Sequence, residues 1–286
     1  MKILIKGAGD LATGIAHRLY RAGYQILMTE TAVPTTVRRT VAFSRAVYEG
    51  WCEVEGVKAR LAEDYAAACR IMDAGEIAVI VDEQAEITSA YAPQVVVDAI
   101  LAKRNLGTGM TDAKLVIGVG PGFTAGEDCH AVIETKRGHD IGRVITAGSA
   151  IPNTGIPGDI GGYTTERLIR AGADGIFCPL VQIGDIVKKG QRVANVISAA
   201  DLRFDAQEAT VTGVYAQMPG IVRGMLQEGI FVTKGMKAGD IDARCERSNC
   251  FTISDKARSI GGGVLEAVAG YEHKINGNQK RNNTCI

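Results

Sequence analysis

Residues 1–14 read MKILIKGAGDLATG, and this stretch decides the expected fold. A short apolar run, Ile3–Ile5, ends in glycines, and the residues beyond them place apolar side chains at helical spacing: Leu11, Ile15 and Leu19. Residues 24–28 then have the pattern of a second strand. A strand, a glycine turn, a helix and another strand predict the opening β-α-β unit of a Rossmann-like domain.

The glycine turn has the form Gly-x-Gly-x-x-Ala. In dinucleotide-binding proteins these small residues permit the tight turn, the approach of a pyrophosphate and close packing of the helix. Glu30 follows about 20 residues later, where an acidic residue holds a ribose hydroxyl. We therefore predict a site for NAD(P) or a related dinucleotide, formed by Gly7, Gly9, Asp10, Leu11, Ala12 and Glu30. The alternative is a domain of this kind whose pocket binds nothing.

Further apolar runs predict buried strands at 77–81, 95–100 and 115–119. Residues 65–72 predict an intervening helix, and alternating strands and helices favour a parallel, doubly wound sheet. Residues 131–133 and 144–145 either continue that sheet or form its antiparallel edge. A second glycine-rich loop, residues 120–126, would lie at the carboxyl end of a strand, where such sheets bind ligands. We therefore add Gly120 and Gly122 to the cofactor site.

Three reactive side chains follow this loop: Asp128, Cys129 and His130. A carboxylate, a thiol and an imidazole this close indicate either a metal site or a nucleophile with its base. We assign no metal and take these three as the candidate catalytic residues. The alternative is a turn-capping Asp128 and a half-buried His130, because Cys129 and His130 point to opposite faces if they lie in a strand.

An internal repeat occupies residues 175–235. Gly175, Gln182 and Lys189 recur as Gly220, Gln227 and Lys234, each 45 residues later. Two such copies predict two interlocking β-motifs related by a pseudo-twofold axis. They resemble the halves of a biotinyl/lipoyl-type barrel, in which a lysine in the joining hairpin carries the prosthetic group. The joining stretch 194–218 contains no lysine, so we expect no covalent biotin or lipoate.

Composition excludes several classes of protein. The 32 Lys and Arg residues balance 32 Asp and Glu residues, so there is no basic field for a nucleic-acid partner. The seven cysteines include no C-x-x-C pair, which is typical of neither a disulfide framework nor a zinc finger. No run of about 18 apolar residues and no signal peptide is present, so we expect a cytoplasmic protein with no membrane partner.

Five segments spread over nearly the whole chain carry a family resemblance: residues 6–14, 119–135, 152–155, 239–242 and 253–266. Together they resemble the selenium-dependent molybdenum hydroxylase system protein family, of the YqeB type. The resemblance implies an accessory or maturation protein, whose partners would be a molybdenum hydroxylase or its maturation factors and a nucleotide. Transfer of sulfur or selenium needs a soft thiol, which gives Cys129 and Cys250 a role within that family.

The expected architecture is a Rossmann-like parallel-sheet domain over residues 1–165, a biotinyl/lipoyl-like β barrel-sandwich domain over 166–248, a C-terminal helical segment over 249–272 and a disordered tail over 273–286. Two other functions stay open: a free-standing NAD(P)-dependent oxidoreductase and a non-catalytic docking scaffold. Whether the protein is an enzyme or a homo-oligomer also stays open. Residues 254–256 and 261–263 allow either an anion-binding turn or close helix packing, and we expect packing.

Overall fold

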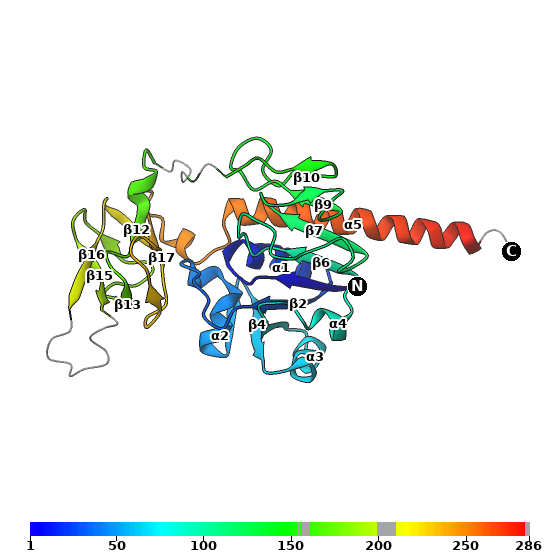
Figure 1. Cartoon of the computed structure of the whole chain (residues 1–286), viewed down its shortest axis with the longest axis horizontal. Helices are drawn as coiled ribbons and strands as arrows, with labels where there is room; N and C mark the ends of the chain where they lie inside the picture. The colour runs from blue at the N-terminus through cyan, green and yellow to red at the C-terminus, as the bar shows by residue number, and fades with distance from the viewer. Residues whose placement is uncertain (154, 156–160, 199–209, 284–286) are drawn as a thin grey trace. The chain divides into compact units, whose positions relative to one another are not determined.

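The computed structural model describes residues 1–153, 155, 161–198 and 210–283, the last seven of these by backbone alone. The chain divides into two compact units, whose elements are labelled in Figure 1. Unit 1 comprises Met1–Ala32, Phe43–Thr154 and Ile253–Ile286, and unit 2 comprises Val33–Ala42 and Gly155–Thr252. Each unit therefore draws on stretches that are far apart in the sequence, whereas the expected domains were continuous.

Unit 1 is built on a nine-stranded sheet of order β10-β9-β7-β6-β1-β2-β5-β4-β3. Its strands are β1 (Lys2–Lys6), β2 (Gln25–Glu30), β3 (Trp51–Val54), β4 (Val57–Ala62), β5 (Ile77–Val81), β6 (Val95–Asp98), β7 (Leu115–Val119), β9 (Ala131–Ile133) and β10 (Val144–Ile145). The seven inner strands of this order, which run from β9 at one side to β4 at the other, pair in parallel. The two edge strands, β10 and β3, pair antiparallel with their neighbours. A short pair, β8 (Thr124–Ala125) and β11 (Gly148–Ser149), lies apart from this sheet.

Helices connect only one half of this sheet. Helix α1 (Asp10–Arg21) links β1 to β2, and α3 (Tyr65–Asp73) links β4 to β5. The side chain of Asp64 accepts the N–H of Ala67 and thereby caps the start of α3. The shorter α2 (Ala46–Glu49) and α4 (Thr88–Tyr91) complete this half. The connections from β6 to β7 and from β7 to β9 are described throughout and contain loops in place of helices.

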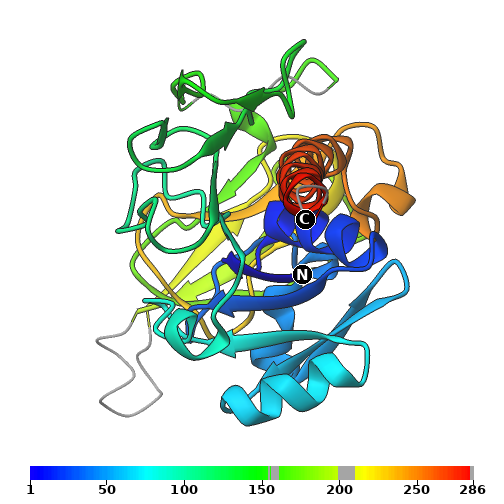
Figure 2. The same ribbon diagram turned by 90° about the vertical axis from the view of Figure 1, so that its right-hand side faces the viewer.

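The C-terminal helix α5 (Asp255–Asn283) packs mainly along the crossover helix α1 (Figure 2). It also packs against β7, β9 and β10, in the half that lacks crossover helices. A Cβ at Gly261 would lie 2.8 Å from the carbonyl oxygen of Gly14, and one at Gly263 would collide with that of Gly142. The expected packing role of these glycines is therefore confirmed. The helix continues through residues 273–283, where polar composition had suggested a disordered tail, and residues 284–286 lie outside the described chain.

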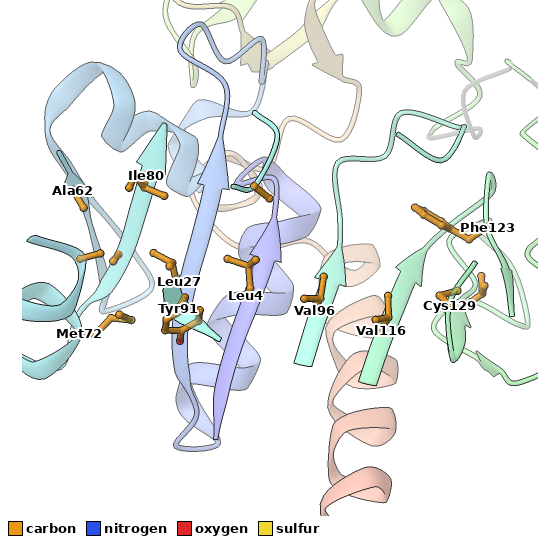
Figure 3. Close-up of a cluster of buried hydrophobic side chains, with 14 of the residues drawn as sticks. Leu4, Leu27, Ala62, Met72, Ile80, Tyr91, Val96, Val116, Phe123 and Cys129 are labelled. Carbon is orange, nitrogen blue, oxygen red and sulfur yellow. The ribbon is translucent and has the colours of Figure 1, made fainter. Parts of the chain in front are cut away.

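One face of the sheet carries a continuous apolar cluster (Figure 3). Successive strands contribute side chains that include Leu4, Leu27, Ile80, Val96 and Val116. Helix α3 adds Met72 and α4 adds Tyr91, whereas loops add Phe123 and Cys129 over β7 and β9. Burying such a side chain stabilises the fold by about 1.5–3 kcal/mol, so this layer is a main source of the unit's stability.

Unit 2 contains two four-stranded antiparallel sheets, of order β12-β19-β17-β14 and β16-β15-β13-β18. The strands are β12 (Leu168–Arg170), β13 (Gly175–Pro179), β14 (Ile186–Val187), β15 (Arg192–Ile197), β16 (Val211–Tyr215), β17 (Gly220–Met225), β18 (Phe231–Val232) and β19 (Lys237–Asp242). Strand β13 pairs with β18 and β14 with β17, so each copy of the repeat places a strand in the other's sheet. The predicted interlocking of the two copies is confirmed.

The expected fold class requires correction in both units. The first sheet is mixed, and the connections from β6 to β7 and from β7 to β9 contain no helix, so it is not the doubly wound parallel sheet of a Rossmann domain. Unit 2 combines the repeat with β12 and β16 into two separate antiparallel sheets, rather than a biotinyl/lipoyl barrel. Local patterning predicts strands and helices, but pairing with distant segments such as α5 decides the architecture.

Two further expectations concern absences. Residues 199–209, in the stretch that joins the two copies, lie outside the described residues, so the absence of covalent biotin or lipoate stays a prediction. Across the described residues, no helix has the length and apolar character needed to cross a membrane.

Candidate functional site

The glycine turn between β1 and α1 binds the chain's own Glu30. Gly7 has a φ of +92°, which glycine adopts without strain, and Gly9 is the N-cap of α1. The Glu30 carboxylate accepts the N–H groups of Ala8 and Thr31, both at 2.9 Å. Burial raises the pKa of Glu30, while these two hydrogen bonds act to lower it. The side chain that was expected to hold a ribose is therefore engaged by the turn itself.

The other predicted cofactor residues lie at the same edge of the sheet, at the carboxyl ends of the parallel strands. Asp10 and Leu11 are half-buried in the first turn of α1, and Ala12 is buried. Gly120 and Gly122 have φ angles of +84° and +111°. A Cβ at Gly120 would lie 2.8 Å from the Thr135 hydroxyl, and one at Gly122 would lie 2.7 Å from the Arg104 backbone. Both glycines thus permit close contact between loops.

Asp128, Cys129 and His130 each make a structural contact. Asp128 accepts the N–H of Thr124 at 2.7 Å, and the Nδ1 of His130 accepts the N–H of Val116 at 3.0 Å. Cys129 is fully buried in the apolar cluster, and burial raises the pKa of its thiol. The three side chains are therefore held by separate partners. Their catalytic assignment stays a prediction that a test of thiol reactivity can decide.

Backbone strain also gathers at this edge of the sheet. In the loop from β6 to β7, Leu101 and Lys103 have φ angles of +63° and +64°, in the left-handed region that favours glycine. Such conformations cost on the order of 1 kcal/mol or more and occur often at functional sites. The strained backbone therefore indicates that the loops at the carboxyl ends of β6 and β7 are candidates for a functional site.

Lys6, at the end of β1, holds this loop in place. Its Nζ donates to the Thr108 hydroxyl at 2.9 Å and to the Asp112 carboxylate at 3.2 Å. The Thr108 hydroxyl in turn donates to the buried Asp98 at 2.7 Å. The amine of Lys6 is thus fully committed to the structure of the edge.

Lys256 is a second lysine at this edge, in the first turn of α5, and belongs to the stretch 254–256 that was considered above as an anion-binding turn. It is half-buried, and its Nζ has no hydrogen bond or ion pair with any residue in the described part of the chain. Burial lowers the pKa of its amine, as does the nearby charge of Arg137. The charges of Asp10, Glu134 and Asp255 act in the opposite direction.

The groups around Lys256 come from three separate elements. Arg137 donates to both carboxylate oxygens of Asp255, at 2.5 and 3.2 Å, so these two charges largely compensate one another. Glu134 is buried directly after β9 and accepts the N–H groups of Lys136 at 2.6 Å and Ile151 at 2.8 Å. Asp10 lies in the first turn of α1. The Lys256 amine thus lies in the field of one cation, Arg137, and of three carboxylates.

This arrangement is suited to acid–base or nucleophilic chemistry. A lysine whose pKa is lowered is neutral at a lower pH than an exposed lysine, and the neutral amine is the base and the nucleophile. Within the described residues, no group of three or more His, Cys, Asp or Glu side chains is placed to hold a metal ion. Nothing in the spacing of the sequence links Lys256 to Asp10 and Glu134, since only the fold brings them together.

No protein-family model matches the chain. Over 272 residues it is 48% identical to the uncharacterized protein YqeB of Escherichia coli (strain K12). The match covers 95% of this chain and 48% of YqeB, so the chain spans about half the length of that relative. The chain is therefore a homologue of part of YqeB. An uncharacterized relative transfers no activity.

Similarity to solved structures is low. An aspartoacylase family protein from Mesorhizobium loti is 10% identical, with 84% of each chain covered and a TM-score of 0.29. The ectoine utilization protein EutE from Ruegeria pomeroyi is 12% identical, with 84% of each chain covered and a TM-score of 0.27. A succinylglutamate desuccinylase from Silicibacter sp. TM1040 is 11% identical, with the same coverage and a TM-score of 0.27. At these values neither fold nor activity transfers from them.

These findings correct the expected functions. The homologue is uncharacterized and gives no support for a molybdenum or selenium role. The expected maturation factor and NAD(P)-dependent oxidoreductase are therefore withdrawn, together with the NAD(P) cofactor. The hydrogen bonds that Glu30 accepts from Ala8 of the glycine turn and from its neighbour Thr31 give a physical reason for the last correction. The expected nucleotide, hydroxylase and homo-oligomer partners are tested by nothing in the structure and stay predictions.

Proposed function

We propose that the carboxyl edge of the unit 1 sheet is an enzyme active site whose reactive group is the Lys256 amine. The observation that carries this proposal is an amine that is half-buried, has no hydrogen bond or ion pair with any described residue and is affected by the charges of Arg137, Asp10, Glu134 and Asp255. A group with a perturbed pKa beside specific charged partners marks a candidate functional site. The substrate would be a small molecule that exchanges a proton or forms a bond with Nζ.

Two other lysines of unit 1 provide the contrast. Lys6 uses its amine to hold Thr108 and Asp112, and Lys2 donates to the Tyr91 carbonyl oxygen and lies 5.3 Å from the centre of the Tyr91 ring. Each of these amines stabilises the fold through a direct partner. The Lys256 amine lacks such a partner among the described residues, although its burial has a cost, which a catalytic role explains.

Competitive acetylation tests this proposal in the full chain. Trace acetic anhydride is applied over a series of pH values, and peptide mass spectrometry measures the modification of each lysine. We expect Lys256 to reach half-maximal reactivity at a lower pH than the exposed Lys58, because burial favours its neutral form. A profile for Lys256 that coincides with that of Lys58, or lies above it, overturns the proposal.

A ligand screen supplies the second test. Small metabolites that raise the melting temperature of the wild type are measured again with Lys256→Met and with the matched surface variant Lys58→Met. We expect the stabilisation to be lost in Lys256→Met and kept in Lys58→Met. Ligands that stabilise both variants equally bind elsewhere, and that result contradicts the assignment of this edge as the site.

A further inference from the structure

The sheet β16-β15-β13-β18 of unit 2 has one buried face and one face that is open to solvent. We infer that the second of these, which we call the open face, is an interface with a second copy of this chain. Three strands of the sheet, β13, β15 and β16, are labelled in Figure 1. The inference concerns unit 2 alone and does not depend on the site proposed in unit 1.

A row of four apolar side chains crosses the open face from one edge strand to the other. Phe231 of β18 pairs with Ile176 of β13. Ile176 pairs on its other side with Ile197 of β15, which pairs in turn with Val211 of β16. Residues directly opposite one another in an antiparallel sheet point to the same face, so the four side chains lie side by side. Phe231 and Val211, at the ends of the row, are 52% and 47% exposed, and the two isoleucines between them are half-buried.

The next outward positions continue the open face without a charged side chain. Cys178 of β13 pairs with Asn195 of β15, which pairs with Gly213 of β16. The Tyr215 ring lies over Gly213, because a Cβ at Gly213 would be 2.8 Å from the ring carbons. The alternate position Phe177 points to the opposite face of the sheet and is fully buried. A contiguous apolar surface of this kind marks an interaction site.

The other sheet of unit 2 provides a covered counterpart. All six residues of β17 are buried, so both faces of this strand are covered. The N–H of Met225 donates to the Val37 carbonyl oxygen at 2.7 Å, and the Arg39 side chain donates to the Met225 carbonyl oxygen at 2.9 Å. The segment Val33–Ala42 of the same unit therefore packs on this sheet. On the open face, by contrast, the ends of the apolar row stay about half exposed in the described chain.

The two faces also differ in chemistry at positions that the repeat makes equivalent. The offset of 45 residues relates Ile176, Cys178 and Ile197 of the open face to Ile221, Arg223 and Asp242. Arg223 and Asp242 are buried and form an ion pair with an N–O distance of 3.8 Å. The covered sheet thus carries charges that need polar partners, whereas the open face presents apolar groups at the same positions.

A second copy of the open face satisfies this requirement. In a twofold dimer both copies use the same patch, so the patch must be complementary to itself. An apolar row against an apolar row meets this condition, and sheets commonly pack face to face through such side chains. A charged partner would lose its hydration over the row without gaining a hydrogen bond.

The margins of the open face carry opposite charges. Arg192 pairs with Tyr215 on the β16 side, and Glu228 lies three residues before Phe231 on the β18 side. Burial, and then the charge of Glu228, raise the pKa of the Cys178 thiol, which places Glu228 near this face. Neither Arg192 nor Glu228 has an ion pair with a residue in the described part of the chain. A twofold axis along the strands brings the arginine side of one copy over the glutamate side of the other.

The size of the open face predicts a weak dimer. Four strands of about five residues, spaced by about 4.8 Å, cover on the order of 300 Å² in each copy. Standard protein interfaces bury about 800 Å² per partner. We therefore expect dimers to form only as the protein concentration rises.

Sedimentation equilibrium of the full chain, from low micromolar to near-millimolar concentration, tests the inference. We expect the mean mass to rise from one chain towards two. Phe231→Glu places a charge in the apolar row and should raise the dissociation constant by about tenfold or more. Ile186→Glu is the matched control, because Ile186 corresponds to Phe231 in the other copy of the repeat, is 62% exposed and lies in the other sheet. It should leave the dissociation constant unchanged.

Charge reversal tests the arrangement of the two copies. Arg192→Glu should weaken the dimer, because like charges then meet at the margins, and the addition of Glu228→Arg should restore it. Far-ultraviolet circular dichroism checks that each variant keeps its sheets. Val211→Glu, at the other end of the row, repeats the central test if Phe231→Glu folds poorly.

Three outcomes overturn the inference. A chain that stays monomeric at every concentration leaves the open face to another segment or another protein. A dimer that Phe231→Glu and Val211→Glu leave intact, or that Ile186→Glu weakens equally, forms through a different face. A double variant that associates no better than Arg192→Glu contradicts the twofold arrangement along the strands.

Discussion

The two halves of the unit 1 sheet are covered in different ways. Around β2, β4 and β5 the cover is local in sequence, because α1 and α3 are crossovers between neighbouring parallel strands. Around β7 and β9 the crossovers are loops, and α5 arrives from the far end of the chain. The functional candidate lies where the two kinds of cover meet, because α5 brings Lys256 near Asp10 of α1 and Glu134 after β9.

The largest effect is expected where α5 meets the loop after β9. Gly263→Val places side-chain atoms where a Cβ already collides with the Gly142 carbonyl oxygen, and neither backbone can move without breaking the packing. We expect a loss of more than about 3 kcal/mol in the free energy of unfolding, measured by urea titration. Hydrogen exchange should show the opening concentrated in β7, β9 and α5. Equal opening around α3 would contradict the division of the sheet into two halves.

The locally covered half can be tested at Leu27. This side chain is fully buried in the apolar cluster to which α3 also contributes. Leu27→Ala should lower the free energy of unfolding by about 3 kcal/mol, because the cavity is closed only in part by its neighbours. The acetylation of Lys256 at lowered pH should persist in the folded fraction, since Leu27 lies on β2 and α5 packs against α1, β7, β9 and β10. Loss of this reactivity in protein that is still folded would show that the halves are coupled.

Cys129 distinguishes a core residue from a reactive thiol in the loop-covered half. Cys129→Ser buries a hydroxyl among apolar side chains, and we expect a loss of about 2 kcal/mol in the free energy of unfolding. Iodoacetamide should leave Cys129 unmodified in the native chain, since burial raises the pKa of its thiol. Rapid native alkylation of Cys129, combined with unchanged stability of the serine variant, would restore the predicted catalytic role.

Gly262 provides the matched opposite of Gly263 on the same helix. No atom lies within 4 Å of a Cβ placed at Gly262, so a methyl group there meets open space. Gly262→Ala should raise the free energy of unfolding by about 0.5–1 kcal/mol, because alanine loses less conformational entropy in a helix. A destabilised Gly262→Ala would show that α5 lies differently on the sheet from the arrangement described above.

The smallest expected effect is a trend with pH at Lys256. Because its pKa in the folded chain lies below the ordinary value of 10.5, the unfolded chain holds this proton more strongly. The stability of the wild type relative to Lys256→Met should therefore rise with pH from the lowered folded pKa up to about 10.5 and then level off. Urea titrations over this range measure the difference, and a falling difference would reverse the inferred sign of the pKa shift.

The sequence is informative where contacts are local. Residues 2–30 form the expected strand, helix and strand because the apolar spacing and the glycine turn act within one short stretch. Glu30 shows the limit of this reasoning: it lies at the expected edge, but its carboxylate binds Ala8 and Thr31 of its own chain. Spacing predicts where a side chain lies, whereas the partner of that side chain depends on the completed loop.

The candidate site shows the same limit over a longer distance. Lys256 follows a polar turn that could begin any surface helix, and its neighbours Asp10 and Glu134 are separated from it by most of the chain. The glycines at 261 and 263 did carry a signal, since close packing of α5 requires them. That signal indicates contact but does not identify the surface contacted, so the site becomes visible only in the folded unit.

The interlocked pairing in unit 2 has a consequence for assembly. A single copy of the motif leaves β13 or β17 without the strand that completes its sheet, so two copies are needed whether or not one chain holds both. Separate copies would have to meet as a twofold dimer, and dilution would take such a dimer apart. When one polypeptide holds both copies, they meet within the same molecule at a fixed effective concentration. The stability of the completed sheets therefore does not depend on the protein concentration.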